Sequence, residues 1–196
     1  KVITATGDWD KNGPAAIADG LFQITSAQKP AAVLITSTAS GKEIAGRLAV
    51  KTGSGIITDA ISVDKDLITT QSVFGGSTTV HASVTTGVPI ITLRANSIEP
   101  VTATSTPAVE EFAVTLSDAA KLATITSATP VVKGGRPDLT EASVVISGGR
   151  GTNGDFKPVE ALADALGAAV GASRAATDAG WYPHSHQVGQ LSLIHI

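Results

Sequence analysis

A glycine-rich turn is the stretch of this sequence with the clearest capacity to bind a ligand. Residues Gly149–Gly154 match the spacing G-x-G-x-x-G, follow the apolar run Val144–Ile146 and precede apolar residues at helical spacing over Asp155–Leu166. Glycines let the backbone approach a phosphate, and a helix N-terminus offers free N–H groups to an anion. In a chain with 20 glycines, the motif alone favours a dinucleotide site no more than an ordinary turn.

The end of the next predicted strand argues against a nicotinamide cofactor. NAD sites place an acid about 20 residues after the glycines, where it holds the ribose hydroxyls. The strand predicted over Ala168–Ala172 ends instead in Ser173 and Arg174, a hydroxyl and a cation. Arg174 is suited to hold a phosphate or to lie against a flavin ring, but it is equally placed to pair with Asp178 on a helix surface. The two residues favour an anionic or electron-rich ligand and leave both roles of Arg174 open.

Other chemistries lack their motifs near this turn. Trp181 lies in the densest aromatic stretch and is compatible with a planar ligand or with the core. His184 and His186 would point in opposite directions on a strand, and no third ligand stands nearby, so we expect no metal site. Ser147 lacks the G-x-S-x-G pattern and no Lys follows the glycines. Acyl transfer and nucleotide hydrolysis are therefore not expected.

Composition narrows the class of protein further. The chain has 196 residues, no cysteine, a formal charge of −3 and 16% charged residues. This balance offers no basic face for a nucleic acid, and the absence of cysteine excludes disulfides and thiolate metal sites. The apolar runs are far shorter than the roughly 20 residues that cross a bilayer. We expect no membrane span and, since no signal peptide is visible, a cytoplasmic location.

Upstream of the turn, strands and helices alternate. The segment up to Val63 predicts the order strand, helix, strand, helix, strand, with elements over Val2–Thr6, Pro14–Ser26, Ala31–Ser37, Glu43–Lys51 and Ser54–Val63. This order is typical of a parallel sheet with right-handed crossovers. Short Thr- and Val-rich segments follow, over Leu67–Phe74, Thr78–Val84, Pro89–Arg94 and Glu111–Leu116, and predict antiparallel or mixed strands. Residues Ala123–Val132 predict one more strand.

The predicted fold is α/β in two domains. An N-terminal parallel-sheet domain with added antiparallel strands covers residues 1–132, and Gly- and Pro-containing residues 133–142 form a linker. Residues 143–190 form the first βαβ of a Rossmann-like second domain, and residues 191–196 form a tail. The glycine turn lies between the first strand and the helix of this βαβ unit.

Three blocks of sequence around the turn resemble the α subunits of electron transfer flavoprotein. These blocks are Val145–Gly151 (VISGGRG), Val159–Trp181 (VEALADALGAAVGASRAATDAGW) and Gln187–Gln190 (QVGQ). The resemblance is nearly continuous over Arg136–Gln190, and the stretch Leu34–Asp59 resembles the same family less distinctively. It therefore covers nearly the whole chain.

The resemblance implies an electron carrier rather than an enzyme. Family members are αβ heterodimers that pass electrons from flavin dehydrogenases, such as the acyl-CoA dehydrogenases of fatty acid β-oxidation, to a membrane quinone oxidoreductase. FAD lies mostly in the second domain of α. Carried over by motif, Arg150, Ser173 and Arg174 would contact FAD. Val188, Gly189 and Gln190 would lie along the flavin ring.

The sequence departs from the family pattern at its end. Leu191 and Ser192 stand where the family has Thr-Gly, whose hydroxyl reaches the flavin, and Leu191–Ile196 resembles nothing in the family. We expect a fragment that lacks both ends of the family's chain, with a non-native tail and too little of the flavin site to hold FAD tightly. The alternative hypothesis is a nucleotide or small-molecule binding module without a redox role, built on the strand, turn and helix of Ile35–Leu48.

Overall fold

The chain folds into two units, each with its own hydrophobic core. The structure, a computed structural model, describes residues 1–7, 11–102, 104–129 and 134–189. Contacts divide the chain into Lys1–Ala128 and Thr129–Ile196, called unit 1 and unit 2 below. Both units are α/β, as predicted.

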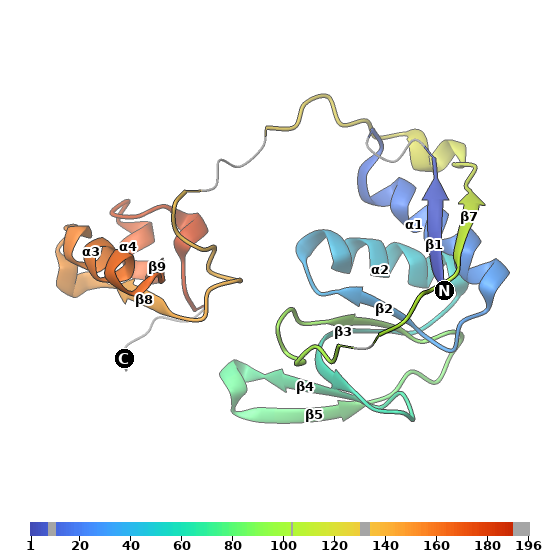
Figure 1. Cartoon of the computed structure of the whole chain (residues 1–196), viewed down its shortest axis with the longest axis horizontal. Coiled ribbons are helices and arrows are strands. Elements are labelled where there is room, and N and C mark those ends of the chain that lie inside the picture. The colour runs from blue at the N-terminus through green and yellow to red at the C-terminus, as the bar shows by residue number, and fades with distance from the viewer. Residues whose placement is uncertain (8–10, 103, 130–133, 190–196) are drawn as a thin grey trace. The chain divides into compact units, whose positions relative to one another are not determined.

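Unit 1 alternates strands and helices and then continues in strands alone (Figure 1). Its elements are β1 (Val2–Thr6), α1 (Gly13–Gln28), β2 (Val33–Thr36), α2 (Ala39–Thr52), β3 (Ile56–Val63), β4 (Thr69–Val73), β5 (Thr78–Ala82), β6 (Ile90–Leu93) and β7 (Val109–Ala113), with short 3-10 helices η1 (Phe74–Gly76) and η2 (Asp118–Lys121). The predicted element types are confirmed over these residues. The first strand has the predicted bounds, whereas the other boundaries differ by a few residues.

The main sheet of unit 1 has the strand order β2-β6-β3-β4-β5. Strands β2, β6 and β3 are parallel, β4 pairs antiparallel with β3, and β5 pairs antiparallel with β4. Strand β6 lies between β2 and β3. Its residues Ile90, Ile91 and Thr92 are fully buried, as expected for a strand covered on both faces. Helix α2 packs Leu48 against Ile90 in this core, and Figure 1 shows α1 and α2 on one side of the sheet.

Two expectations about unit 1 are wrong. Strand β1 does not join β2 and β3 but pairs in parallel with β7 in a separate two-stranded sheet, because β6 takes the place between β2 and β3. The strand predicted over Ala123–Val132 is absent from its described part, residues 123–129; the rest lies outside the described residues. Thr- and Ile-rich sequence forms a strand only beside a partner edge, and the Ile125 N–H instead donates a single hydrogen bond to the Lys11 carbonyl.

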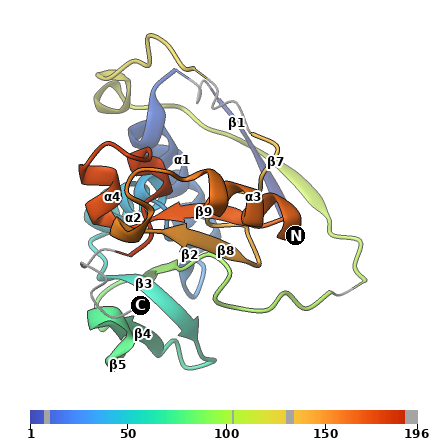
Figure 2. The ribbon, with the colours of Figure 1, turned by 90° about the vertical axis from the view of Figure 1, so that its left-hand side faces the viewer.

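Unit 2 is the predicted βαβ unit with short additions (Figure 2). Its elements are β8 (Val145–Gly148), η3 (Arg150–Thr152), α3 (Lys157–Leu166), β9 (Ala169–Ala172), α4 (Arg174–Asp178) and η4 (His184–His186). Strands β8 and β9 are parallel neighbours. Gly167, in left-handed conformation at φ 61°, ends α3 and turns the chain into β9.

The core of unit 2 lies between α3 and the two strands. Buried Phe156 and Ala163 pack with Val170 of β9 and Ala176 of α4. Arg136, in the segment that precedes β8, donates two hydrogen bonds to the Asp164 carboxylate of α3. These contacts hold α3 against β9 and tie the segment before β8 to α3.

Candidate functional site

The glycine turn begins where β8 ends and does not enter the helix directly. Arg150–Thr152 forms the 3-10 turn η3, and Asn153 and Gly154 follow in left-handed conformation at φ 49° and 86°. Helix α3 begins only at Lys157, two residues after the predicted start. The prediction that the glycines open the helix is therefore wrong in detail, because the turn satisfies its own carbonyls: the Thr152 N–H donates to Gly149 O and the Asn153 N–H to Arg150 O.

Close packing requires glycine at two positions here and leaves little room at a third. A Cβ on Gly148 would lie 2.7 Å from Cε1 of the buried Phe156 ring, and one on Gly171 would lie 2.6 Å from Ser147 Oγ. A Cβ on Gly149 would lie 3.3 Å from Ser173 Oγ. Glycine at these positions leaves room for the side chains of Phe156, Ser147 and Ser173 against the backbone of β8, β9 and the turn.

The turn leaves hydrogen-bond donors unused. In the described part of the chain, the backbone N–H groups of Arg150 and Gly151 donate no hydrogen bond, and the exposed Arg150 guanidinium has no ion pair. Nothing lies within 4 Å of the place where a Cβ on Gly151 would stand. Free N–H groups, a free guanidinium and open space are what a phosphate group requires.

Ser173 and Arg174 lie beside this turn, at the carboxyl end of β9. The Ser173 N–H donates to Gly148 O at 2.9 Å, and its hydroxyl caps α4 by accepting from the Ala176 N–H at 3.4 Å. Arg174 Nε donates to Asp178 Oδ2 at 3.2 Å, with the two side chains 59% and 53% exposed. The surface pair that the sequence left open is thus formed, yet an exposed pair of this kind contributes little and separates readily.

The segment Val188–Gly189 also reaches this edge. The Val188 N–H donates to Ala172 O at 2.9 Å, next to a parallel bridge between Ala172 and Gln187. Gly189 is in left-handed conformation at φ 76°. Gln190, which the resemblance places along the flavin, lies outside the described residues. The structure therefore brings the glycine turn, Ser173 and Val188 to the edge of the β8–β9 sheet at which both strands have their carboxyl ends.

The aromatic and histidine residues that follow α4 have structural roles. Tyr182 stacks on Phe156 with ring centroids 4.5 Å apart, and its hydroxyl donates to Glu160 Oε1 at 2.9 Å. Burial, together with that hydrogen bond, raises the pKa of Tyr182. His186 Nδ1 lies 3.1 Å from Val170 O. Trp181 lies 3.4 Å from where a Cβ on Gly154 would stand and is 37% exposed, so it borders the turn without being core.

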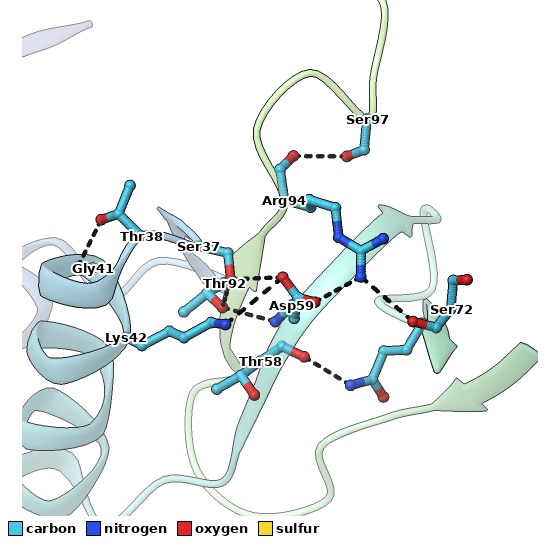
Figure 3. A network of polar contacts seen from close by, with 11 residues as sticks. Ser37, Thr38, Gly41, Lys42, Thr58, Asp59, Ser72, Thr92, Arg94 and Ser97 are labelled. Carbon is cyan, nitrogen blue, oxygen red and sulfur yellow. Dashed lines mark hydrogen bonds and ion pairs between the residues drawn. The ribbon is translucent and has the colours of Figure 1, made fainter. Parts of the chain in front are cut away.

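A second polar cluster lies at the carboxyl ends of the parallel strands of unit 1, around Asp59 (Figure 3). Arg94 Nη2 donates to Asp59 Oδ2 at 2.6 Å, and Lys42 Nζ lies 3.8 Å from Asp59 Oδ1. Ser37 Oγ donates to the same Oδ1 at 3.1 Å, Thr92 Oγ1 donates to Ser37, and the Asp59 N–H donates to Thr92 Oγ1. Asp59 thus closes a ring of hydrogen bonds onto its own carboxylate.

The electrostatics of this cluster favour the charged form of Asp59. The hydrogen bond from Arg94 lowers the pKa of the Asp59 carboxyl, and Ser37 adds to the effect, while burial opposes it. Asp59 has a left-handed backbone conformation at φ 61° and lies at an irregularity in the pairing of β3. A residue other than glycine adopts this conformation only with support from its neighbours.

Sequence reasoning did not find this cluster. Ser37, Asp59 and Arg94 come from three different segments and meet only because β6 lies between β2 and β3. The available signal was a lone Asp inside the apolar pattern of Ser54–Val63, together with a cation directly after another predicted strand.

Two family models match the chain. The electron transfer flavoprotein domain matches residues 1–117, and the electron transfer flavoprotein FAD-binding domain matches residues 138–193. The chain belongs to the electron transfer flavoprotein family. The FAD-binding match spans the glycine turn, the Ser173–Arg174 pair and the Val188 segment, which are the features gathered at the edge of unit 2.

Individual relatives agree with the family assignment. The electron transfer flavoprotein subunit alpha of Mycobacterium leprae is 46% identical over 194 residues, covering 97% of this chain and 60% of the relative. The protein of the same name from Syntrophomonas wolfei is 43% identical over 172 residues, 85% of this chain and 54% of the relative. A probable mitochondrial subunit alpha from Caenorhabditis elegans is 34% identical over 200 residues, 99% of this chain and 59% of the relative.

The chain thus spans about 60% of the length of such relatives. Among the residues described, no helix is long and apolar enough to cross a membrane, and no group of three or more His, Cys, Asp or Glu side chains could hold a metal ion.

Proposed function

We propose that this chain is α-subunit sequence of an electron transfer flavoprotein and that its unit 2 contributes to an FAD site. The observation that carries the proposal is the set of free donors at Arg150 and Gly151, beside Ser173 and within the region matched by the FAD-binding model. Arg150 would pair with the FAD phosphates, Ser173 and Arg174 would contact the cofactor, and Val188–Gln190 would lie along the flavin ring. FAD supplies the redox chemistry, since it gains and loses electrons singly or in pairs.

The role of the protein groups is to bind and to tune. Arg174 places a fixed positive charge near the ligand edge, and a cation beside a flavin favours its reduced, anionic forms. Its exposed pair with Asp178 separates at small cost when a ligand competes. The protein would thus act as a carrier rather than an enzyme.

The partners form the finer part of the proposal. The word "subunit" in the relatives' names supports an αβ heterodimer with an electron transfer flavoprotein β subunit. The electron donors would be flavin dehydrogenases such as acyl-CoA dehydrogenases, the acceptor a membrane quinone oxidoreductase, and the location the bacterial cytoplasm.

We expect FAD binding by this chain to be weak and reversible. Within the described residues, the sheet of unit 2 has two strands, and Val144 and Val145 are 46% and 37% exposed. Parallel sheets are normally covered on both faces. FAD should therefore bind in a titration but dissociate during gel filtration; a chain that retains one flavin per molecule through the column would contradict this expectation.

The decisive experiment is a titration of the chain with FAD, followed by flavin fluorescence, with AMP and ATP compared by thermal shift. Replacing Arg150 by Ala should weaken FAD binding about tenfold, the size of one charge-assisted hydrogen bond. The matched control is Arg47→Ala in unit 1, where an exposed arginine pairs with Glu43, and it should leave FAD affinity unchanged.

The alternative, a nucleotide-binding module without a redox role, predicts a different result. AMP or ATP would raise the melting temperature while FAD would not, and Arg150→Ala would have no effect. The geometry of unit 1 disfavours this outcome because Lys42 of α2 and Arg94, which directly follows β6, already contact Asp59.

A further inference from the structure

Thr177 connects the two parts of the edge at which FAD is proposed to bind. It belongs to α4, the helix that begins directly after Ser173, and is 2% exposed. Its hydroxyl Oγ1 lies 3.0 Å from Arg174 O and 3.1 Å from Gln187 Oε1. A hydroxyl has a single proton, so the two acceptors share it.

The side-chain amide of Gln187 links Thr177 to Gly189 by a hydrogen bond at each of its two ends. With Oε1 facing Thr177, the amide Nε2 of Gln187 donates to Gly189 O at 3.1 Å. The reverse orientation of the amide would set Oε1 against Gly189 O, two acceptors facing each other. The Gly189 carbonyl thus sets the amide orientation, and in this orientation Gln187 Oε1 accepts from the Thr177 hydroxyl, so the hydroxyl holds the side chain that bonds the left-handed Gly189 peptide.

The backbone of the same segment is held against β9. The Val188 N–H donates to Ala172 O, and Val188 Cγ1 lies 2.7 Å from where a Cβ on Gly171 would stand. The Thr177–Gln187 contact is thus the side-chain part of a docking that also uses a backbone hydrogen bond and close packing.

We propose that the buried Thr177 hydroxyl is a positioning group of the FAD site, which acts through Gln187 to hold Val188–Gly189 in place beside the Ser173–Arg174 turn. This inference rests on the proposed function, in which Val188 and Gly189 lie along the flavin. Thr177 itself is buried and would not touch the cofactor.

The test compares Thr177→Val, which keeps the shape and removes the hydroxyl, with Thr177→Ser, which keeps the hydroxyl. The first measurement is amide hydrogen exchange of Val188 in the chain without FAD. Thr177→Val should speed this exchange about fivefold, as loss of one net hydrogen bond predicts, whereas Thr177→Ser should stay within about twofold of the original.

The second measurement is the FAD titration. Thr177→Val should raise the Kd for FAD about three- to tenfold, and Thr177→Ser should restore most of the affinity. Gln187→Met removes this contact together with the hydrogen bond from Gln187 Nε2 to Gly189 O, so it should raise the Kd at least as much as Thr177→Val, and the double variant should be no worse than Gln187→Met alone. This coupling also guards against a variant that merely folds poorly, since general destabilisation would add.

The outcomes separate this inference from the proposed function. Unchanged Val188 exchange in Thr177→Val, with FAD binding intact in the original chain, overturns the positioning role alone. Faster exchange with an unchanged Kd shows that the contact is structural and also overturns the role. Absence of FAD binding in the original chain overturns the proposed function, and the FAD role of Thr177 falls with it.

Discussion

The two units use the same architectural position in opposite ways. In each, parallel strands end at a common edge where a turn leads toward a helix, the place at which α/β proteins usually bind ligands. In unit 1 this edge is occupied by the carboxylate of Asp59, which contacts Lys42 and Arg94. In unit 2, as far as the structure describes its residues, the edge carries backbone N–H groups that donate no hydrogen bond and an Arg150 side chain without an ion pair.

The difference shows that strand order alone does not make a binding site. Positive charge and donor groups are present at both edges, but a protein carboxylate that satisfies them removes the gain a ligand would bring. An edge becomes a site where the chain leaves its donors unsatisfied and keeps side chains away from them. Gly151, with open space around it, has this property in unit 2.

The largest effect is expected from a substitution that disturbs the close packing at the unit 2 edge. Gly148→Ala should destabilise unit 2 by about 2 kcal/mol, because its Cβ would meet the buried Phe156 ring at 2.7 Å and overpacking costs of this order are typical. Hydrogen exchange of peptides from β8 and β9 measures the loss. The control is Gly151→Ala, whose Cβ meets nothing within 4 Å, and a loss of equal size there would show that the space around Phe156 does not matter.

The βαβ order of unit 2 could be predicted from the sequence because its signals are local. Apolar runs, helical spacing and glycines gave β8, α3 and β9 to within a few residues. The 3-10 turn η3 could not be predicted in this way. It differs from the first turn of an α-helix by only a few backbone hydrogen bonds, which the residue pattern does not reveal.

Unit 1 shows where such prediction ends. The Asp59 cluster joins Ser37, Asp59 and Arg94, which are brought together by the placement of β6 between β2 and β3. That strand order follows from the burial of β6 on both faces, a tertiary effect that no local pattern contains. The same placement left β1 to pair with β7.

A second test addresses Asp59 itself. Asp59→Asn keeps the shape and the tolerance of left-handed backbone but removes the charge, and it should cost unit 1 about 1 kcal/mol at neutral pH, a modest value because the side chain is 37% exposed. Since the folded state lowers the pKa of Asp59, its contribution is complete above the ordinary value of about 3.9 and is lost as the pH falls through the lowered pKa. The difference between the two proteins should therefore shrink in acid.

Hydrogen exchange of β3 and β6 peptides at neutral and acidic pH measures this difference. Asp66→Asn is the control, because Asp66 is a well-exposed residue whose ion pair is with the adjacent Lys65. A penalty for Asp59→Asn that stays constant down to acidic pH would show that the charge of Asp59 is not what closes the unit 1 edge.

The smallest effects are expected at Arg174. Its partner is the carboxylate of Asp178, just as the partner of Arg94 in unit 1 is the carboxylate of Asp59. The Arg174–Asp178 pair is about half exposed and joins residues four apart on one helix, so Asp178→Ala should change stability by about 0.3 kcal/mol and leave the Kd for FAD within about twofold. Arg174→Ala should cost the same small stability but raise the Kd about threefold or more, because it also removes the proposed contact to the cofactor. Flavin titration and urea unfolding of the two variants decide the matter. Equal effects of the two substitutions on FAD binding would mean that Arg174 serves only its surface pair and that the open edge of unit 2 does not use it.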